Sequence, residues 1–162
     1  MVDVDRPRRW PAYAVALLLL GYAAGKAVFA LQARLGFPGG PPVPAAEAAA
    51  YLLDPAFAQW LASASGVVGA CVALATVTPF GRWVSRTLML VVLAVMTLAV
   101  VGGGGIMALD GFVGIGVGWQ WYHGVLGLVA IGATVEMSRS YLVATRPARR
   151  PGGASAAPGA GG

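Results

Sequence analysis

Charged side chains are scarce in this chain, where they make up 10% of 162 residues. An ordinary soluble domain carries about 25%. Hydrophobic residues reach 58%. The shortage of charge excludes a solvated globular body and predicts an integral membrane protein.

Cysteine and histidine are each present once, as Cys71 and His123. A lone cysteine excludes an internal disulfide, a CxxC redox pair and a cysteine metal cluster, so Cys71 is expected to be a packed small residue. One histidine without a cysteine cluster does not make a usual zinc site, and nothing supports a haem held by His123 and a methionine. We therefore predict no metal and no cofactor.

Acidic residues number only six, and the net charge is +5. Such a balance can indicate nucleic-acid binding, but nine of the eleven basic residues flank apolar segments. This is the position that membrane topology gives them. We therefore expect the lipid bilayer, and no nucleic acid, as the main partner.

Four apolar segments are long enough to cross a membrane. Residues 87–109 contain no charge and would form a helix of roughly 34 Å, against a hydrocarbon core of about 30 Å. Similar segments cover residues 11–32, 56–78 and 119–142. The first is too long for a signal-peptide core, so we read it as an uncleaved span. The predicted fold is an all-α, antiparallel four-helix bundle over residues 10–145, with an N-terminal arm over 1–9 and a disordered tail over 146–162.

The connections between the spans differ in character. An alanine-rich stretch over residues 45–53, which follows a proline, predicts a short helix on the membrane surface. Residues 79–86 form a short hairpin connection. Residues 110–118 are rich in glycine and apolar, which favours an outer connection sunk into the interface, with a re-entrant turn as the alternative. Four glycines at 102–105 are expected to loosen or kink the third span.

Small residues recur at helical spacing and predict close helix contacts. The first span carries Gly21 and Gly25, four residues apart. The second carries a stripe formed by Ala62, Gly66, Gly69, Ala73 and Thr76.

Basic residues also predict the orientation. Three arginines lie in the N-terminal arm, two in the connection at 79–86, and four at the end of the fourth span and in the tail, whereas the other side has only Arg34. The positive-inside rule then places both termini in the cytoplasm, in the inner (plasma) membrane.

Lys26 is the polar residue whose position is hardest to explain. Counting from Trp10 places it about 24 Å along the first span, about 6 Å below the outer boundary. Either its ammonium extends to the interface past lipid, or it faces the bundle and meets an acceptor. If it faces inward, Asp110 is the predicted partner, with His123 nearby. Together these residues belong to a predicted outer polar cluster: Lys26, Arg34, Asp54, Gln59, Asp110, Gln120 and His123.

Glu136 and Arg139 lie near the inner boundary on the fourth span. Their separation of three residues predicts a local ion pair. Glu136 and Lys26 differ by about 16 Å in depth, so we do not expect them to touch.

Three short motifs resemble a family of uncharacterised small bacterial membrane proteins with four spans. They are Lys26-Ala-Val-Phe-Ala-Leu-Gln-Ala-Arg-Leu-Gly36, Gly81-Arg82-Trp-Val-Ser-Arg86 and the tryptophan-rich start of the fourth span. The resemblance covers residues 10–145, and this chain has Ser85 where the family usually has proline. It implies the four-span architecture and supplies no catalytic residue.

Function is less constrained than architecture. No nucleophile with a base, paired acids, phosphate loop or metal spacing is present, so we do not expect an enzyme. The leading hypothesis is a small membrane factor or partner subunit that acts through helix contacts, with another membrane protein or a second copy as partner. A small-molecule or proton-linked transporter that uses the outer polar cluster is the alternative. An enzyme acting on lipid or quinone is the weaker one.

Overall fold

The computed structural model describes residues 8–116 and 118–146. Within these ranges the chain is all-helical and contains no strand, in agreement with the predicted class. Most of the predicted arm and nearly all of the predicted disordered tail lie outside the described residues. The elements are α1 (Trp10–Leu31), α2 (Ala45–Ala49), α3 (Pro55–Ala75), the 3-10 helix η1 (Pro79–Trp83), α4 (Arg86–Val113) and α5 (Trp121–Ala144).

Four of these helices, α1, α3, α4 and α5, are long and apolar enough to span a membrane. Local sequence explains where they begin. Proline occupies the first turn of α1 and of α3, where its missing N–H costs nothing. The Asp54 carboxylate accepts a hydrogen bond from the Phe57 N–H at 2.9 Å, and Ser85 Oγ accepts one from the Leu88 N–H at 3.3 Å. These side chains cap α3 and α4.

Helix α4 differs most from its predicted bounds. It runs without a break through the four glycines and past Asp110, where we expected the outer connection to begin, and ends at Val113. Gly114 then adopts a left-handed conformation with φ of 74°, and its N–H donates to the Asp110 carbonyl. Glycine is the usual residue at this position after a helix, so Gly114 sets the end of α4. The predicted connection over 110–118 is therefore shortened at its start.

Helix α2 is shorter than predicted, with five residues and none buried. A helix this short gains little from its own hydrogen bonds, and no packed face extends it toward Asp54.

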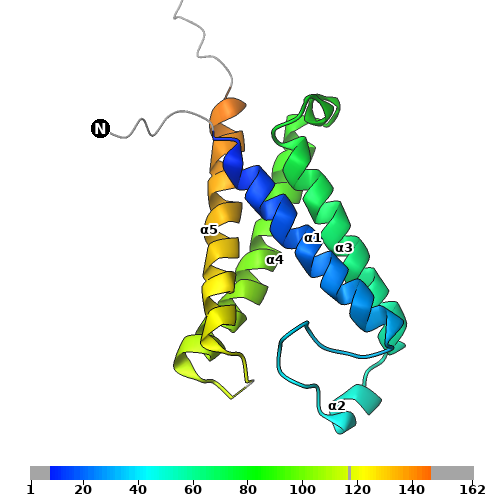
Figure 1. Cartoon of the computed structure of the whole chain (residues 1–162). Coiled ribbons are helices and arrows are strands. Elements are labelled where there is room, and N and C mark those ends of the chain that lie inside the picture. The colour runs from blue at the N-terminus through cyan, green and yellow to red at the C-terminus, as the bar shows by residue number, and fades with distance from the viewer. Residues whose placement is uncertain (1–7, 117, 147–162) are drawn as a thin grey trace, which may run out of the picture.

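The spans pack as two pairs. Helix α1 packs mainly against α3, and α4 against α5, whereas α3 and α4 barely touch. Figure 1 shows the pairs meeting near the start of α1 and diverging toward the end that carries α2. In the first pair, Ser63 Oγ donates to the Ala23 carbonyl at 2.9 Å, beside Gly66. In the second pair the backbones of Gly104 and Gly127 are in direct contact.

Two expectations about small residues were wrong. A Cβ at Gly21 would have no packing partner within 4 Å, and one at Gly25 would meet Pro38 of the loop, so the contact of α1 with α3 uses Ala23 instead. Cys71 is exposed on α3 and is not a packed residue.

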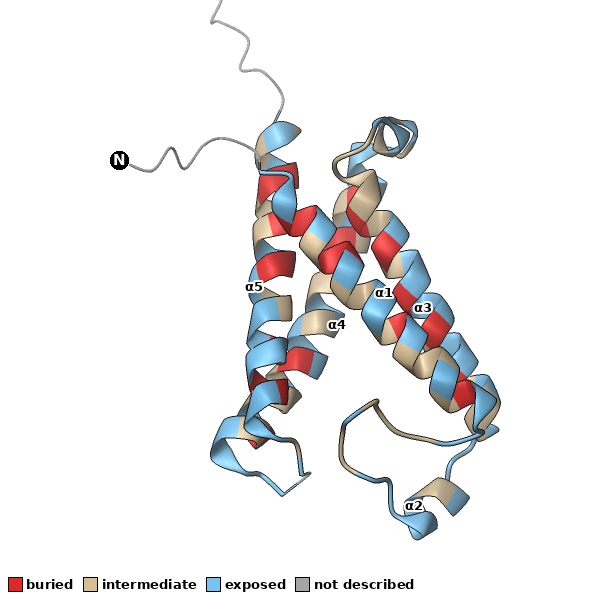
Figure 2. Cartoon of the chain, viewed as in Figure 1, coloured by how far each residue is buried: buried red, intermediate tan, exposed pale blue. Residues whose placement is uncertain are grey.

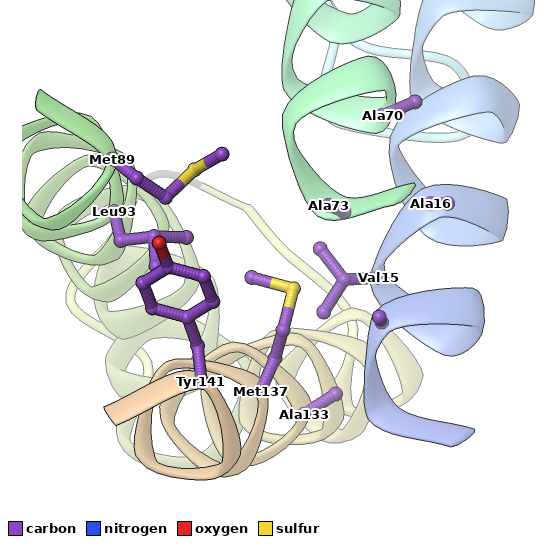
Figure 3. Packing of buried hydrophobic residues seen from close by; sticks show 10 residues of the cluster. Val15, Ala16, Ala70, Ala73, Met89, Leu93, Ala133, Met137 and Tyr141 are labelled. Atoms are coloured by element: carbon purple, nitrogen blue, oxygen red, sulfur yellow. The ribbon is translucent and has the colours of Figure 1, made fainter. Parts of the chain in front are cut away.

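Buried residues occur along the length of the helices (Figure 2), but the main cluster of buried apolar side chains lies toward the end of the bundle where α1 begins. All four long helices contribute to it, with Val15 from α1, Ala73 from α3, Leu93 from α4 and Met137 from α5. Figure 3 shows the Met137 side chain reaching from α5 toward Val15. Because this core holds only the end near the start of α1, other contacts must hold the opposite end together.

Candidate functional site

The loop after α1 fills the space where the two helix pairs diverge. Lys26 Nζ donates to the Gly36 carbonyl oxygen at 2.6 Å, and Gln59 Nε2 donates to the same oxygen at 3.1 Å. Lys26 comes from α1 and Gln59 from α3, so a single carbonyl joins both helices to the loop. A charged donor makes the first of these bonds the stronger one.

The Lys26 ammonium also lies over two aromatic rings. Its Nζ is 5.5 Å from the centroid of Tyr22 and 5.6 Å from that of Phe37. Such contacts attract a cation to the ring face. Lys26 therefore faces the loop and not lipid, and its hydrogen bond goes to a backbone carbonyl instead of the predicted Asp110 carboxylate.

A row of rings continues from this point toward α5. The centroids of Tyr22 and Phe37 are 5.7 Å apart, those of Phe37 and Trp119 are 5.3 Å apart, and those of Trp119 and His123 are 5.0 Å apart. The last two pairs have the edge-to-face geometry that aromatic side chains favour. The loop thus links the α1/α3 pair to the α4/α5 pair through Phe37.

His123 is buried, with 4% of its surface exposed. Its Nδ1 accepts a hydrogen bond from the Gln120 N–H at 3.3 Å. The Nε2 edge faces Gly39, where an added Cβ would lie 3.5 Å away. His123 therefore fixes the first turn of α5 and packs against the loop.

Asp110 is also buried, and its Oδ2 accepts a hydrogen bond from the Trp119 N–H at 2.6 Å. This bond closes the connection between α4 and α5. It also orients the backbone that presents the Trp119 ring to Phe37. Asp110 thus positions Trp119, whose ring lies beside His123, while the hydrogen bond of Lys26 goes to Gly36.

The remaining predicted residues have local roles. Asp54 caps α3, Gln120 precedes α5, and the Arg34 guanidinium lies 5.8 Å from the Phe29 ring at an exposed position. The Glu136–Arg139 ion pair is present, with Arg139 Nη1 at 3.2 Å from Glu136 Oε1. The predicted outer cluster therefore divides into a loop anchor, formed by Lys26 and Gln59, and a separate group around Asp110 and His123.

An apolar groove of about 630 Å³ lies between the two helix pairs. Its walls come mainly from α3 and α4, with Tyr22 and Phe37 also contributing. Polar side chains are few among its lining residues, which include Ser65 and Tyr22. The groove exists because α3 and α4 barely touch. The row of aromatic rings lies beside it, since Tyr22 and Phe37 belong both to that row and to the groove lining.

Glycines in this groove are not all used by the protein's own packing. Gly66 and Gly69 contact α1, and Gly104 contacts Gly127. Gly103 also lines the groove, but a Cβ placed there would have no packing partner within 4 Å. Glycine costs a helix about 1 kcal/mol relative to alanine, and among the described residues nothing lies within 4 Å of a Cβ added at Gly103 to account for that cost.

Sequence reasoning missed the Gly36 carbonyl, the Phe37 ring and the groove. A backbone acceptor has no signature in a sequence. The high density of glycine and proline after Leu35 could have indicated a closely packed loop. Gly40 in this loop packs so closely on Trp119 that an added Cβ would lie 2.9 Å from its ring.

Within residues 8–116 and 118–146, no three His, Cys, Asp or Glu side chains come close enough to hold a metal ion. No protein-family model, curated protein or solved structure matches this chain. The resemblance to small four-span bacterial proteins remains a prediction.

Proposed function

We propose that the four spans alternate in direction through the inner (plasma) membrane, with both termini in the cytoplasm. The hydrogen bond from the Arg8 N–H to Ser140 Oγ, at 3.4 Å, supports this arrangement because it joins the start of α1 to the end of α5. The excess of arginine at that end supports the orientation.

Within this topology, we propose that the protein is a non-enzymatic partner subunit that binds a transmembrane helix of another membrane protein in the groove between α3 and α4. The single observation that carries the proposal is Gly103, a glycine on the groove wall where an added Cβ would meet none of the described residues within 4 Å.

The physics of helix association in lipid supports this function. Apolar side chains gain little by leaving lipid for protein, so helices associate through close packing, and small residues permit the close approach. The groove offers Gly103 beside Ala99 and Met107 on one wall. Lipid chains fill such a surface less completely than a fixed helix does.

A partner of different sequence fits better than a second copy. A two-fold dimer would set the same concave surface against itself, and two grooves do not fill each other. The transport hypothesis is less favoured, because the groove is mostly apolar and Lys26 is engaged by the Gly36 carbonyl.

Filling the groove tests the proposal. Gly103→Leu should abolish co-purification of the partner from native membranes solubilised in mild detergent. Gly132→Leu is the matched control, because Gly132 is also an exposed helical glycine without a packing partner but lies on α5 and outside the groove. Both changes raise helix propensity, so loss of folding is not expected. Equal partner recovery with both variants, or recovery of the protein's own second copy in place of a different protein, would reject the proposal.

A further inference from the structure

A second cavity, of about 370 Å³, lies at the end of the bundle where α1 begins. Three parts of the chain line it. Arg8 and Arg9 directly precede α1. Thr76 and Thr78 lie between α3 and η1, and Ser140 and Tyr141 belong to α5. The cavity is remote from the outer loop and separate from the groove.

The lining of this cavity is basic and rich in hydroxyl groups. Both arginines are exposed, and the described residues that line the cavity include no carboxylate. Helix α1 also begins here with no acidic residue in its first turn, so no side chain of that turn offsets the charge of the two arginines. The hydrogen bond from the Arg8 N–H to the buried Ser140 Oγ holds the first arginine at the cavity edge.

This chemistry suits a phosphate group. Guanidinium groups bind phosphate oxygens through paired N–H donors. The Ser140 hydroxyl accepts the Arg8 N–H and keeps its own proton for a ligand, whereas the Thr76 hydroxyl donates to the Ala73 carbonyl at 2.6 Å. The volume is at the lower end of the range for small-ligand sites, which fits a headgroup better than a large soluble ligand.

The surroundings favour a lipid as the source of the phosphate. Trp10 and Tyr13, directly after the arginines, are more than half exposed, and both residue types concentrate at the membrane interface. Leu17, one turn further, is 73% exposed, as expected of a side chain in contact with acyl chains. The cavity therefore lies at headgroup depth.

We propose that this cavity binds the phosphate of an anionic phospholipid from the leaflet that meets this end of the bundle. The proposal depends neither on the partner helix nor on which side of the membrane this end faces. It assigns specific binding to Arg8 and Arg9, beyond the general attraction between basic residues and anionic membranes.

Native mass spectrometry of the full chain in detergent tests the proposal, because lipid adducts are read on the folded protein ion. Dioleoyl phosphatidylglycerol is the probe, with dioleoyl phosphatidylcholine for comparison. Arg8→Gln and Arg9→Gln should each weaken phosphatidylglycerol binding about tenfold, as loss of a charged hydrogen bond implies. Arg146→Gln is the matched control, since Arg146 is exposed beyond the end of α5 but does not line the cavity.

Three results would overturn the proposal. Equal weakening by Arg146→Gln would show diffuse attraction and no site. Equal binding of phosphatidylcholine and phosphatidylglycerol would remove the preference for an anionic lipid. In the third test, inorganic phosphate is added at the millimolar concentration that saturates the wild-type protein in the absence of lipid. Displacement of phosphatidylglycerol under that condition would assign the site to free phosphate.

Discussion

The Gly36 carbonyl accepts hydrogen bonds from both Lys26 Nζ and Gln59 Nε2, so two transmembrane helices hold one loop atom. Either donor alone still satisfies this oxygen, whereas loss of both leaves it without these donors. In the double variant Lys26→Met with Gln59→Leu, the loss of unfolding free energy should therefore exceed the sum of the two single losses by about 1 kcal/mol. Unfolding in detergent measures it. Strict additivity would show that the two side chains do not share the acceptor.

Gln59 gives a second prediction at the same place. Its Oε1 is buried without a hydrogen-bond partner among the described residues. Burial of an unsatisfied oxygen is unfavourable, so Gln59→Leu alone should cost less than Lys26→Met. A larger loss for Gln59→Leu in the same unfolding assay would indicate that Oε1 has a partner, such as an internal water.

Neighbouring glycines on α4 should respond in opposite ways to alanine. A Cβ at Gly104 would lie 2.9 Å from the Gly127 carbonyl oxygen, whereas one at Gly105 would meet nothing within 4 Å. Gly104→Ala should therefore destabilise the protein by about 1–3 kcal/mol. Gly105→Ala should be neutral or stabilise it by up to about 1 kcal/mol through helix propensity. Thermal unfolding in detergent compares them, and a similar effect of both changes would contradict the α4–α5 contact.

Substitutions of Asp54 distinguish the effect of helix capping from the effect of negative charge. Its carboxylate accepts the Phe57 N–H, a role that asparagine also fills. Asp54→Ala should cost about 1 kcal/mol of unfolding free energy, and Asp54→Asn much less. If Asp54→Asn were as costly as Asp54→Ala, the negative charge itself would matter, as an ion pair would require.

Cysteine labelling tests the proposed orientation. In a Cys71→Ala background, Glu47→Cys should react with a membrane-impermeant thiol reagent in intact cells. Ser85→Cys should react only after the membrane is opened. The reverse order would invert the topology.

The sequence predicted the four spans because apolar length is a local property, independent of what the helices pack against. It also placed Asp110 and His123 at one end, since counting along helices gives depth. The partner of Lys26 was not predictable, because Gly36 contributes a backbone oxygen whose position depends on the whole loop. The predicted end of α4 was wrong for a related reason, because the burial of Asp110 depends on Trp119, nine residues later.

The groove between α3 and α4 had no sequence signal of its own. The glycines at 102–105 looked like a weak point in a helix, yet α4 is continuous through them. Whether a glycine faces a neighbour, as Gly104 does, or open space, as Gly103 does, depends on the rotation of α4 against α5. Only the assembled helices distinguish these roles.

Site-specific photo-crosslinking tests the partner-helix proposal most directly. A photoreactive amino acid at position 103, activated in intact native membranes, should form a covalent adduct with a membrane protein of different sequence. The same amino acid at position 132 should not form it. An adduct at position 103 that contains only lipid or a second copy of this chain, or equal adducts at both positions, would contradict the claim that the groove binds a partner helix.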